Sequence, residues 1–337
     1  MSTQSQAEVG FAALTPDRIL DAVEQVGVRC TGRVLPLHCM ENRVYELEIE
    51  VDEAHPPKSP SERFVVAKFY RPWRWTPEQI ADEHAFLADL EEDEIPVVAP
   101  RPFPDGTTLR RLTDAPIWFA VFPKAGGRSP DELDDEGLRR LGRLLARMHA
   151  IGGARPAPHR VRLDPDGYGR ASLEVLRTCG ALPPGLAPRY EALVETICAA
   201  SAPAFATAEV QRVHGDCHLG NILWNDAGPR LIDFDDMVRG PCVQDVWLPV
   251  LGRDAEARRQ RGVLLEAYEV LRPFDYRTLA LIEPLRALRM VHFSAWIAKR
   301  WSDPAFPHTF PQFGTERWWQ DQIEGLAEVR DIVEGRS

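Results

Sequence analysis

The chain changes its residue pattern near positions 123–128. Before this point, residues 44–49 alternate apolar with polar residues, and residues 63–69 contain an apolar run with β-branched side chains; both patterns are typical of strands. Beyond it, apolar residues recur at helical spacing, as at positions 138, 141, 144, 145 and 148. We therefore expect an α+β fold with a β-rich first part and a mostly helical second part.

Caps and turns predict individual elements. Thr15 before Pro16 and Thr76 before Pro77 are typical helix starts, so we expect helices over 15–27 and 76–90. The Asn-Asp-Ala-Gly turn at 225–228 predicts a hairpin between the short strands 222–224 and 230–232. Further strands are expected at 108–112, 117–122 and 211–213, a loop at 152–170, and helices at 134–149, 171–179, 186–201 and 279–301, the last being the longest.

The composition limits the partners of the chain. Its 337 residues, 44% of them hydrophobic, suffice for a core in one large domain or two lobes. A net charge of −11 argues against nucleic acid or an anionic membrane as the main partner. The N-terminus lacks the pattern of a signal peptide, no apolar run is long enough to span a bilayer, and the six cysteines lack disulfide or metal-site spacing. We expect a cytoplasmic monomer with reduced thiols.

Residues 213–236 contain a dense group of polar side chains. The segment VHGDCHLGN ends at Asn221, and LIDFDD follows, with Asp233 twelve residues after Asn221. Phosphoryl transfer needs a carboxylate that accepts the proton of the attacking hydroxyl, and hard oxygen ligands for Mg²⁺. A turn bearing Asp216 and Asn221, with a hairpin that returns Asp233, can supply these groups. Each residue alone is also a common turn residue, so the combination and its spacing indicate a phosphoryl-transfer site.

This motif resembles the catalytic and metal loops of the aminoglycoside- and choline-kinase-like branch of the protein kinase superfamily. More closely, the chain resembles the bacterial stress response kinase A family of Ser/Thr protein kinases along nearly its whole length. The stretches that carry this likeness are ENRVYEL, FVVAKFYRPWRWT, FAVFPKAGGR, HGDCHLGNILW, GPCVQDVW, LIEPLRALRMVHFSAWIAKRW and DPAFPHTFP. The resemblance implies a two-lobed protein-kinase-like fold, and with the change of pattern it predicts an N-terminal lobe at 1–122, a hinge at 123–127 and a C-terminal lobe at 128–337.

The resemblance also implies roles for single residues. Asp216 would be the proton acceptor, while Asn221 and Asp233 would bind Mg²⁺, with Asp233 also counted as an essential catalytic residue. Lys68 would bind the ATP phosphates, and Glu83 on the following helix would hold Lys68 by an ion pair. Without the downstream motif, these two would be interpreted as a strand lysine with an exposed amine and a solvated helix residue.

The chain departs from ordinary protein kinases around the nucleotide. It has no GxGxxG loop, and the turn at 37–42 contains no glycine. At Cys39, where the family places a residue close to ATP, a thiol stands in place of a hydroxyl. His-Gly-Asp replaces His-Arg-Asp, Asp233 is followed by Phe-Asp, and no Ala-Pro-Glu segment follows. We therefore do not expect regulation by an activation loop.

Residues beside the motif are expected to support it. Asp235 and Asp236 either add negative charge to the metal site or form an exposed hairpin end. Asp245, at a predicted helix start, is expected to orient the catalytic loop, which His214 and His218 brace by hydrogen bonds.

Two further regions have functional interpretations. The hinge should lie at 122–127, where Gly126 and Gly127 permit movement and the neighbouring backbone would pair with adenine. On the last long helix, spacing predicts a solvated basic face, with substrate docking as the alternative; its members are Arg286, Arg289, Lys299 and Arg300.

Two kinase functions fit these patterns. The first is an ATP- and Mg²⁺-dependent Ser/Thr protein kinase that phosphorylates a protein acceptor and itself in a bacterial stress response. The alternative is a kinase of a small hydroxyl compound, such as an aminoglycoside or choline-like molecule, bound by the helical part. A metal-dependent phosphoesterase would need more histidines in matching loops than the pattern offers. A nucleotide-binding pseudokinase is opposed by the presence of Lys68, Asp216, Asn221 and Asp233.

Overall fold

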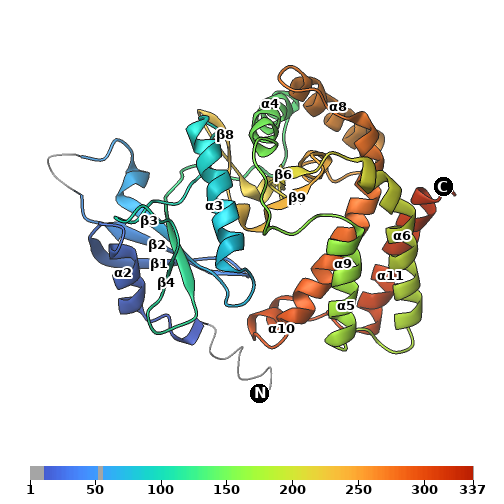
Figure 1. The fold of residues 1–337 in the computed structure, drawn as a ribbon, viewed down its shortest axis with the longest axis horizontal. Coiled ribbons are helices and arrows are strands. Elements are labelled where there is room, and N and C mark those ends of the chain that lie inside the picture. The colour runs from blue at the N-terminus through green and yellow to red at the C-terminus, as the bar shows by residue number, and fades with distance from the viewer. Residues whose placement is uncertain (1–10, 52–55, 337) are drawn as a thin grey trace. The chain divides into compact units, whose positions relative to one another are not determined.

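The computed structural model describes residues 11–51 and 56–336, which form two compact units. Unit 1 comprises Met1–Leu133, Ala157–His159 and Leu219–Asp235. Unit 2 comprises Asp134–Pro156, Arg160–His218 and Asp236–Ser337. Unit 1 contains the sheet and unit 2 most of the helices, so the predicted α+β class is confirmed (Figure 1). The lobe limits 1–122 and 128–337 with a hinge at 123–127 stay a prediction.

A five-stranded antiparallel sheet forms the core of unit 1. In its central strand, buried Ala67 and Phe69 flank Lys68, whose side chain points to the opposite face because side chains alternate along a strand. The register pairs Lys68 with Val44 on one side and with Ala120 on the other, so its backbone is fixed from both directions. The strand order is β1 (Cys30–Leu37), β2 (Arg43–Ile49), β3 (Phe64–Phe69), β5 (Trp118–Pro123) and β4 (Arg110–Arg111).

Two helices of unit 1 begin at the predicted caps. α2 (Pro16–Glu24) follows Thr15, and its apolar face joins the core of the sheet. α3 (Pro77–Glu92) begins with a capping box in which Thr76 and Gln79 satisfy each other's backbone N–H groups. The cap fixes where α3 starts, and therefore which of its residues face the sheet.

The predicted hairpin belongs to unit 1. It consists of β7 (Ile222–Asn225) and β8 (Gly228–Leu231), and the backbone of Arg128 pairs with that of Trp224 in β7. Gly127 precedes this contact with φ +142°, and a Cβ atom there would lie only 3.0 Å from the Trp224 carbonyl oxygen. Glycine is therefore required where the chain leaves β5 and passes the hairpin.

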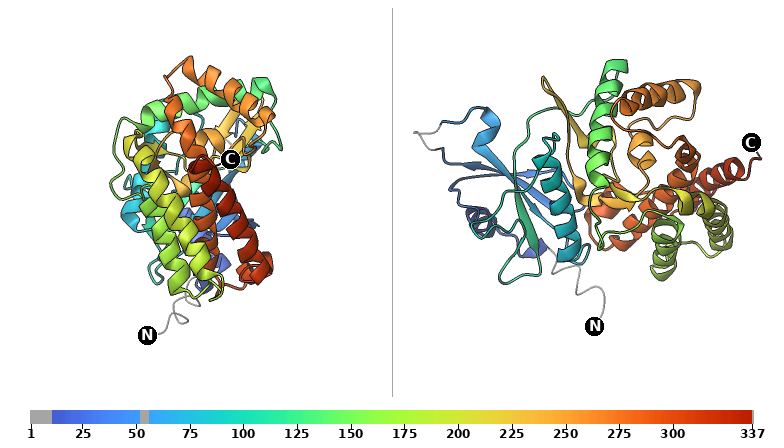
Figure 2. Two further views of the ribbon diagram at one scale, coloured as in Figure 1. Left: turned by 90° about the vertical axis from the view of Figure 1, so that its right-hand side faces the viewer. Right: turned by 45° about the horizontal axis from the view of Figure 1, so that its top comes forward.

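Unit 2 contains two groups of packed helices and a short two-stranded sheet of β6 with β9. In one group α4 packs on α8; in the other α5, α6, α9 and α11 lie side by side, as the left view of Figure 2 shows. Rings of Tyr190 and Trp319 meet edge to face between α6 and α11, with centroids 5.3 Å apart. The bounds are α4 (Asp135–Gly152), α5 (Ala171–Thr178), α6 (Ala187–Thr207), β6 (Gln211–Val213), β9 (Val238–Gly240), α7 (Val243–Trp247), α8 (Ala255–Glu269), α9 (Ile282–Lys299), α10 (Ala305–Thr309) and α11 (Glu316–Val333).

Two expectations about unit 2 were wrong. The longest helix among the described residues is α6 with 21 residues, which continues past Pro203, whereas α9 has 18 because a 3₁₀ segment (Tyr276–Leu281) precedes it. The expected loop at 152–170 ends in a π-helical turn (Pro165–Arg170) that Asp164 caps through the N–H groups of Asp166 and Gly167.

None of the described helices combines the length and apolar character needed to cross a bilayer.

The close contact between α4 and α8 requires glycine at position 142. A methyl group at Gly142 of α4 would overlap the carbonyl oxygen of Leu264 in α8. We predict that Gly142→Ala lowers the free energy of unfolding by about 2 kcal/mol or more, because neither backbone can move without disturbing its helix. Gly262→Ala, within α8 but facing open space, should be neutral or stabilising by up to about 1 kcal/mol. Urea unfolding followed by circular dichroism measures both, and equal effects would contradict the packing argument.

Candidate active site

Lys68 is the centre of a network of opposite charges in unit 1. Its Nζ lies 2.9 Å from Asp233 Oδ1 and 3.2 Å from Asp235 Oδ1. The Lys68 side chain is only 12% exposed. A buried ammonium is tolerated when it is paired, so the sheet lysine and the segment after β8 stabilise each other.

The surroundings of Lys68 keep it protonated. Burial alone would lower the pKa of this amine, but the charges of Asp233, Asp235 and Glu83 outweigh it and raise the pKa well above its ordinary value. Glu83 lies on α3 and is almost fully buried at 1% exposure. Its influence on Lys68 is smaller than that of the two aspartates, which sequence reasoning did not expect as partners of this lysine.

Asp233 has an unusual backbone. Its φ of +59° lies in the left-handed region, which few residues other than glycine adopt and in which Asp is tolerated better than most. Its neighbours fix this conformation: Ile232 N donates to Asn221 O at 3.0 Å, and the ring of Phe234 packs edge to face against Phe86. The Asp233 side chain remains 45% exposed, so its carboxylate is open to a ligand.

Asp235 is buried and bonded to several side chains. Of the two roles that the sequence allowed for it, the exposed hairpin end is therefore wrong. Its side chain is only 5% exposed. One oxygen, Oδ2, accepts from Asn42 Nδ2 at 2.6 Å and from Arg74 Nη1 at 2.9 Å, while Oδ1 contacts Lys68. These bonds connect the segment after β8 to the turn between β1 and β2 and to the start of α3.

Sequence reasoning missed the basic residues of this network. Arg74 also lies 3.6 Å from Glu41, and Arg71 pairs with the same carboxylate at 3.1 Å. Both arginines stand in the FYRPWRWT stretch, where the signal was their nearness in sequence to Lys68. They hold the β1–β2 turn, including Cys39, whose Sγ accepts from Asn42 N at 3.4 Å.

Cys39 lies close to the charged centre of unit 1. Burial raises the pKa of its thiol, and the charges of Asp233 and Lys68 act on the same group. The thiol is therefore protonated at neutral pH and is a weak hydrogen-bonding group there.

In unit 2, Asp245 holds the loop that carries Asp216. The Asp245 carboxylate accepts hydrogen bonds from His214 N at 2.8 Å and Gly215 N at 2.9 Å. His214 in turn accepts from Asp216 N through Nδ1 at 3.3 Å. Gly215 has φ +83°, and a Cβ atom there would overlap the carbonyl oxygen of Asp236. These hydrogen bonds agree with the expectation that Asp245 orients the loop and that His214 braces it.

Asp216 is paired with a residue that sequence reasoning assigned to a solvated face. Arg289 of α9 places Nη1 at 2.6 Å from Asp216 Oδ1, and His218 Nε2 lies 3.5 Å from Oδ2. Burial would raise the pKa of the Asp216 carboxyl, but the hydrogen bond of His218 and the charge of Arg289 hold it well below its usual range. Asp216 is therefore a carboxylate at neutral pH. The Arg289 side chain is 42% exposed, as expected for a solvated face, but its ion pair with Asp216 was not predicted.

The donor atoms of Asn221 and Asp233 suit magnesium. They offer an amide oxygen and a carboxylate, and Mg²⁺ prefers hard oxygen ligands, taking few from the protein while keeping waters and binding substrate phosphates. Within residues 11–51 and 56–336, no three His, Cys, Asp or Glu side chains are arranged to hold a metal among themselves.

Comparison with known proteins identifies relatives along almost the whole chain. Residues 40–282 match the model of the phosphotransferase enzyme family. Stress response kinase A of Escherichia coli (strain K12) is 40% identical over 325 residues, covering 96% of this chain and 95% of the relative. Serine/threonine protein kinase RdoA of Salmonella typhimurium is 38% identical over 324 residues, covering 96% and 94%.

A solved structure shares the fold at lower identity. Amicoumacin kinase hAmiN, in complex with AMP-PNP, Ca²⁺ and Ami, superposes with a TM-score of 0.72 and 18% identity, covering 98% of this chain and 96% of that one. At this identity the likeness concerns the fold alone.

The carboxylate of Asp245 provides a test of the loop. Asp245→Asn keeps the size of the side chain but exchanges one acceptor oxygen for an NH₂ group that faces a backbone donor. We expect the free energy of unfolding to fall by about 2 to 4 kcal/mol, because the group is buried and charged. Asp226→Asn, on the exposed hairpin turn, should change it by less than about 0.5 kcal/mol. Urea unfolding at pH 7 compares the two, and similar small effects would refute the role of Asp245.

Proposed function

The chain belongs to the phosphotransferase enzyme family and, within it, to the stress response kinase A family, and on this premise we propose that it phosphorylates serine or threonine hydroxyls of a protein. It is an ATP-dependent kinase. The finer proposal, which includes autophosphorylation and a role in a bacterial stress response, is carried by the 40% identity to stress response kinase A over 96% of the chain.

We assign the role of catalytic base to Asp216. Its ionised state leaves it able to accept a hydrogen bond from an acceptor hydroxyl, and its loop is fixed by Asp245. A carboxylate with a low pKa is a weak base. Phosphoryl transfer passes through a loose transition state in which orientation of the hydroxyl matters more than early proton removal. The geometry of Asp216 therefore supports positioning of the hydroxyl and acceptance of its proton late in the reaction.

Lys68, Glu83, Asn221 and Asp233 are proposed to serve the nucleotide. Lys68, kept protonated by its acidic neighbours, would bind ATP phosphate oxygens, and Glu83 would keep a negative charge near the amine. Asn221 and Asp233 would hold Mg²⁺, which when bound neutralises negative charge on the phosphates. Cys39 would lie beside the nucleotide as a packing contact rather than a donor, since its thiol is a weak hydrogen-bonding group.

A small-molecule acceptor is the second candidate. It is favoured by the shared fold with amicoumacin kinase, a relationship at 18% identity. The ion pair of Arg289 with Asp216 argues against a cationic acceptor. The guanidinium already neutralises the carboxylate that would otherwise attract a positive group of the acceptor. A hydroxyl on a neutral or anionic segment of a protein fits this charge pattern better.

Transfer of label from ATP tests both candidates. With Mg²⁺, γ-labelled ATP and a generic acceptor protein whose serines and threonines lie in neutral or acidic segments, we expect label on serine or threonine of the acceptor and of the enzyme. Asp216→Asn should reduce it by about 10²- to 10⁴-fold, the usual contribution of a catalytic base. Excess EDTA should abolish it and added Mg²⁺ restore it.

The alternative outcome is distinct. If no protein is labelled, but ATP turnover rises on addition of choline- or aminoglycoside-like alcohols, the acceptor is a small molecule and the protein-kinase proposal fails. Circular dichroism of Asp216→Asn must match the unaltered protein for the comparison to count.

The charge of Lys68 gives a second prediction. Lys68→Met should lower kcat/KM for ATP by about 100-fold or more, because a preorganised charge at the phosphates is lost. Glu83→Gln should have a smaller effect in the same direction. Lys58→Met, at an exposed position, is the matched control and should leave activity unchanged. Equal activity of Lys68→Met and Lys58→Met would remove Lys68 from the nucleotide site.

A further inference from the structure

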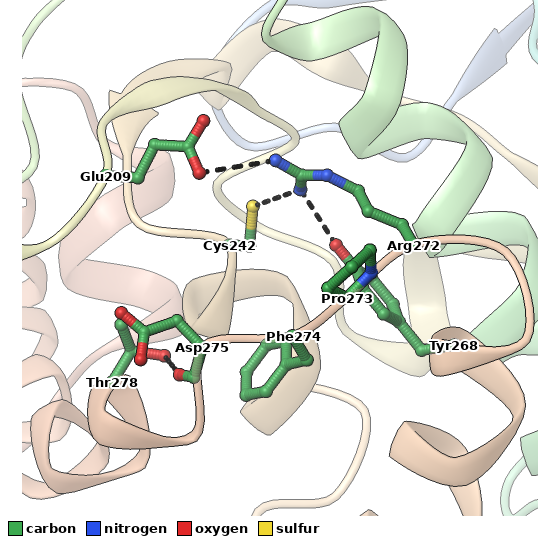
Figure 3. A pocket seen from close by; sticks show the side chains of 8 residues that line it. All are labelled: Glu209, Cys242, Tyr268, Arg272, Pro273, Phe274, Asp275 and Thr278. Atoms are coloured by element: carbon green, nitrogen blue, oxygen red, sulfur yellow. Dashed lines mark hydrogen bonds and ion pairs between the residues drawn. The ribbon is translucent and has the colours of Figure 1, made fainter.

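Unit 2 contains a group of reactive side chains that the proposed reaction does not use. Arg272 Nη1 lies 3.1 Å from the Sγ of Cys242 and 2.9 Å from the Tyr268 hydroxyl, as Figure 3 shows. The same hydroxyl lies 3.1 Å from His149 Nδ1. We call these four residues, Cys242, Arg272, Tyr268 and His149, the Cys242 cluster. They come from α4, the start of α7, α8 and the turn after α8.

Cys242 is reachable from solvent by small molecules. It is partly exposed and lines a cavity of about 30 Å³ together with Tyr268 and Arg272. One water molecule needs roughly 10 to 15 Å³ of such volume, so the cavity admits water or a molecule of similar size, such as hydrogen peroxide. The remaining wall is formed by Glu209, Pro273, Phe274, Asp275 and Thr278 (Figure 3).

The surroundings of Cys242 favour the thiolate. Burial would raise the pKa of this thiol, but the charges and hydrogen bonds of His149 and Arg272 lower it below its ordinary value. Other cysteines behave in the opposite way: burial raises the pKa of Cys198 to about 11 and that of Cys217 well above its usual range. Among these three cysteines, only Cys242 combines access with a stabilised negative charge.

The Cys242 cluster is connected to the loop that carries Asp216. His149, which is fully buried, places Nε2 at 3.1 Å from Asp245 Oδ2. That same oxygen accepts the hydrogen bond of His214 N. A change of charge at Cys242 therefore reaches the backbone of the catalytic loop through two side chains.

We infer that Cys242 is a peroxide-reactive thiol whose oxidation loosens the catalytic loop. The thiolate attacks one oxygen of hydrogen peroxide, an S–O bond forms, the O–O bond breaks, and hydroxide leaves into the solvent, where the buffer protonates it to water. The sulfur is oxidised to a sulfenic acid and the peroxide is reduced to water. The neutral product no longer balances the charges of Arg272 and His149, so the contact of His149 with Asp245 changes. A thiol reductant restores the starting state through a mixed disulfide.

Competition between cysteines within one protein tests the site. The full chain is treated with substoichiometric hydrogen peroxide, trapped with a dimedone-type reagent and mapped by peptide mass spectrometry. We expect Cys242 to be labelled about tenfold faster than Cys179, which is exposed and would react first if access alone decided. Arg272→Met should remove this preference. Faster labelling of Cys179, or an unchanged preference in Arg272→Met, would overturn the proposal.

Hydrogen exchange tests the connection to the loop without relying on kinase activity. Peroxide treatment should speed exchange of the His214 and Gly215 amides by about tenfold, and reductant should reverse it. Cys242→Ser, or Cys242→Ala if the serine variant fails to fold, should show no response to peroxide. A response that persists in both variants, or none in the unaltered protein after Cys242 is labelled, would overturn the coupling. Failure of the kinase proposal would leave both readouts intact.

Discussion

A single buried carboxylate organises the loop of unit 2 that carries Asp216. Asp245 accepts the N–H groups of His214 and Gly215 with its two oxygens and contacts His149 as well. Backbone donors in a tight turn cannot pair with each other, and burying them without partners would be strongly unfavourable. The turn, the direction of Asp216 and the state of the Cys242 cluster all depend on this one group.

In unit 1, a buried amine is stabilised by several charged side chains rather than by one. In its proposed role, Lys68 must be held in place by burial and must also keep its positive charge for the ATP phosphates. Burial in a medium of low polarity disfavours the charged amine, so the two requirements oppose each other. Asp233 and Asp235 reconcile them by direct ion pairs. Arg74 then compensates the surplus negative charge at Asp235, so the network approaches neutrality while its central amine stays protonated.

The sequence could predict elements and residue types, and it failed where partners come from distant segments. Strands, capped helices and the hairpin follow local rules, and they were correct to within a few residues in most cases. Arg289 lies 73 residues from Asp216, and Arg74 lies 161 residues from Asp235. Helical spacing cannot tell a solvated arginine from one that meets a carboxylate of another segment, so only the tertiary structure reveals these pairs. The same applies to the Cys242 cluster, whose members look unremarkable one by one.

The left-handed backbone of Asp233 has a consequence for how this position can change. Most side chains would be strained at φ +59°, whereas glycine and asparagine adopt it readily. Glycine at this position would avoid the steric cost of the left-handed conformation but would also remove the carboxylate. Aspartate at this position therefore provides a carboxylate at a conformational cost that glycine would not have. Asparagine would remove the charge while keeping this conformation accessible and the size of the side chain nearly unchanged.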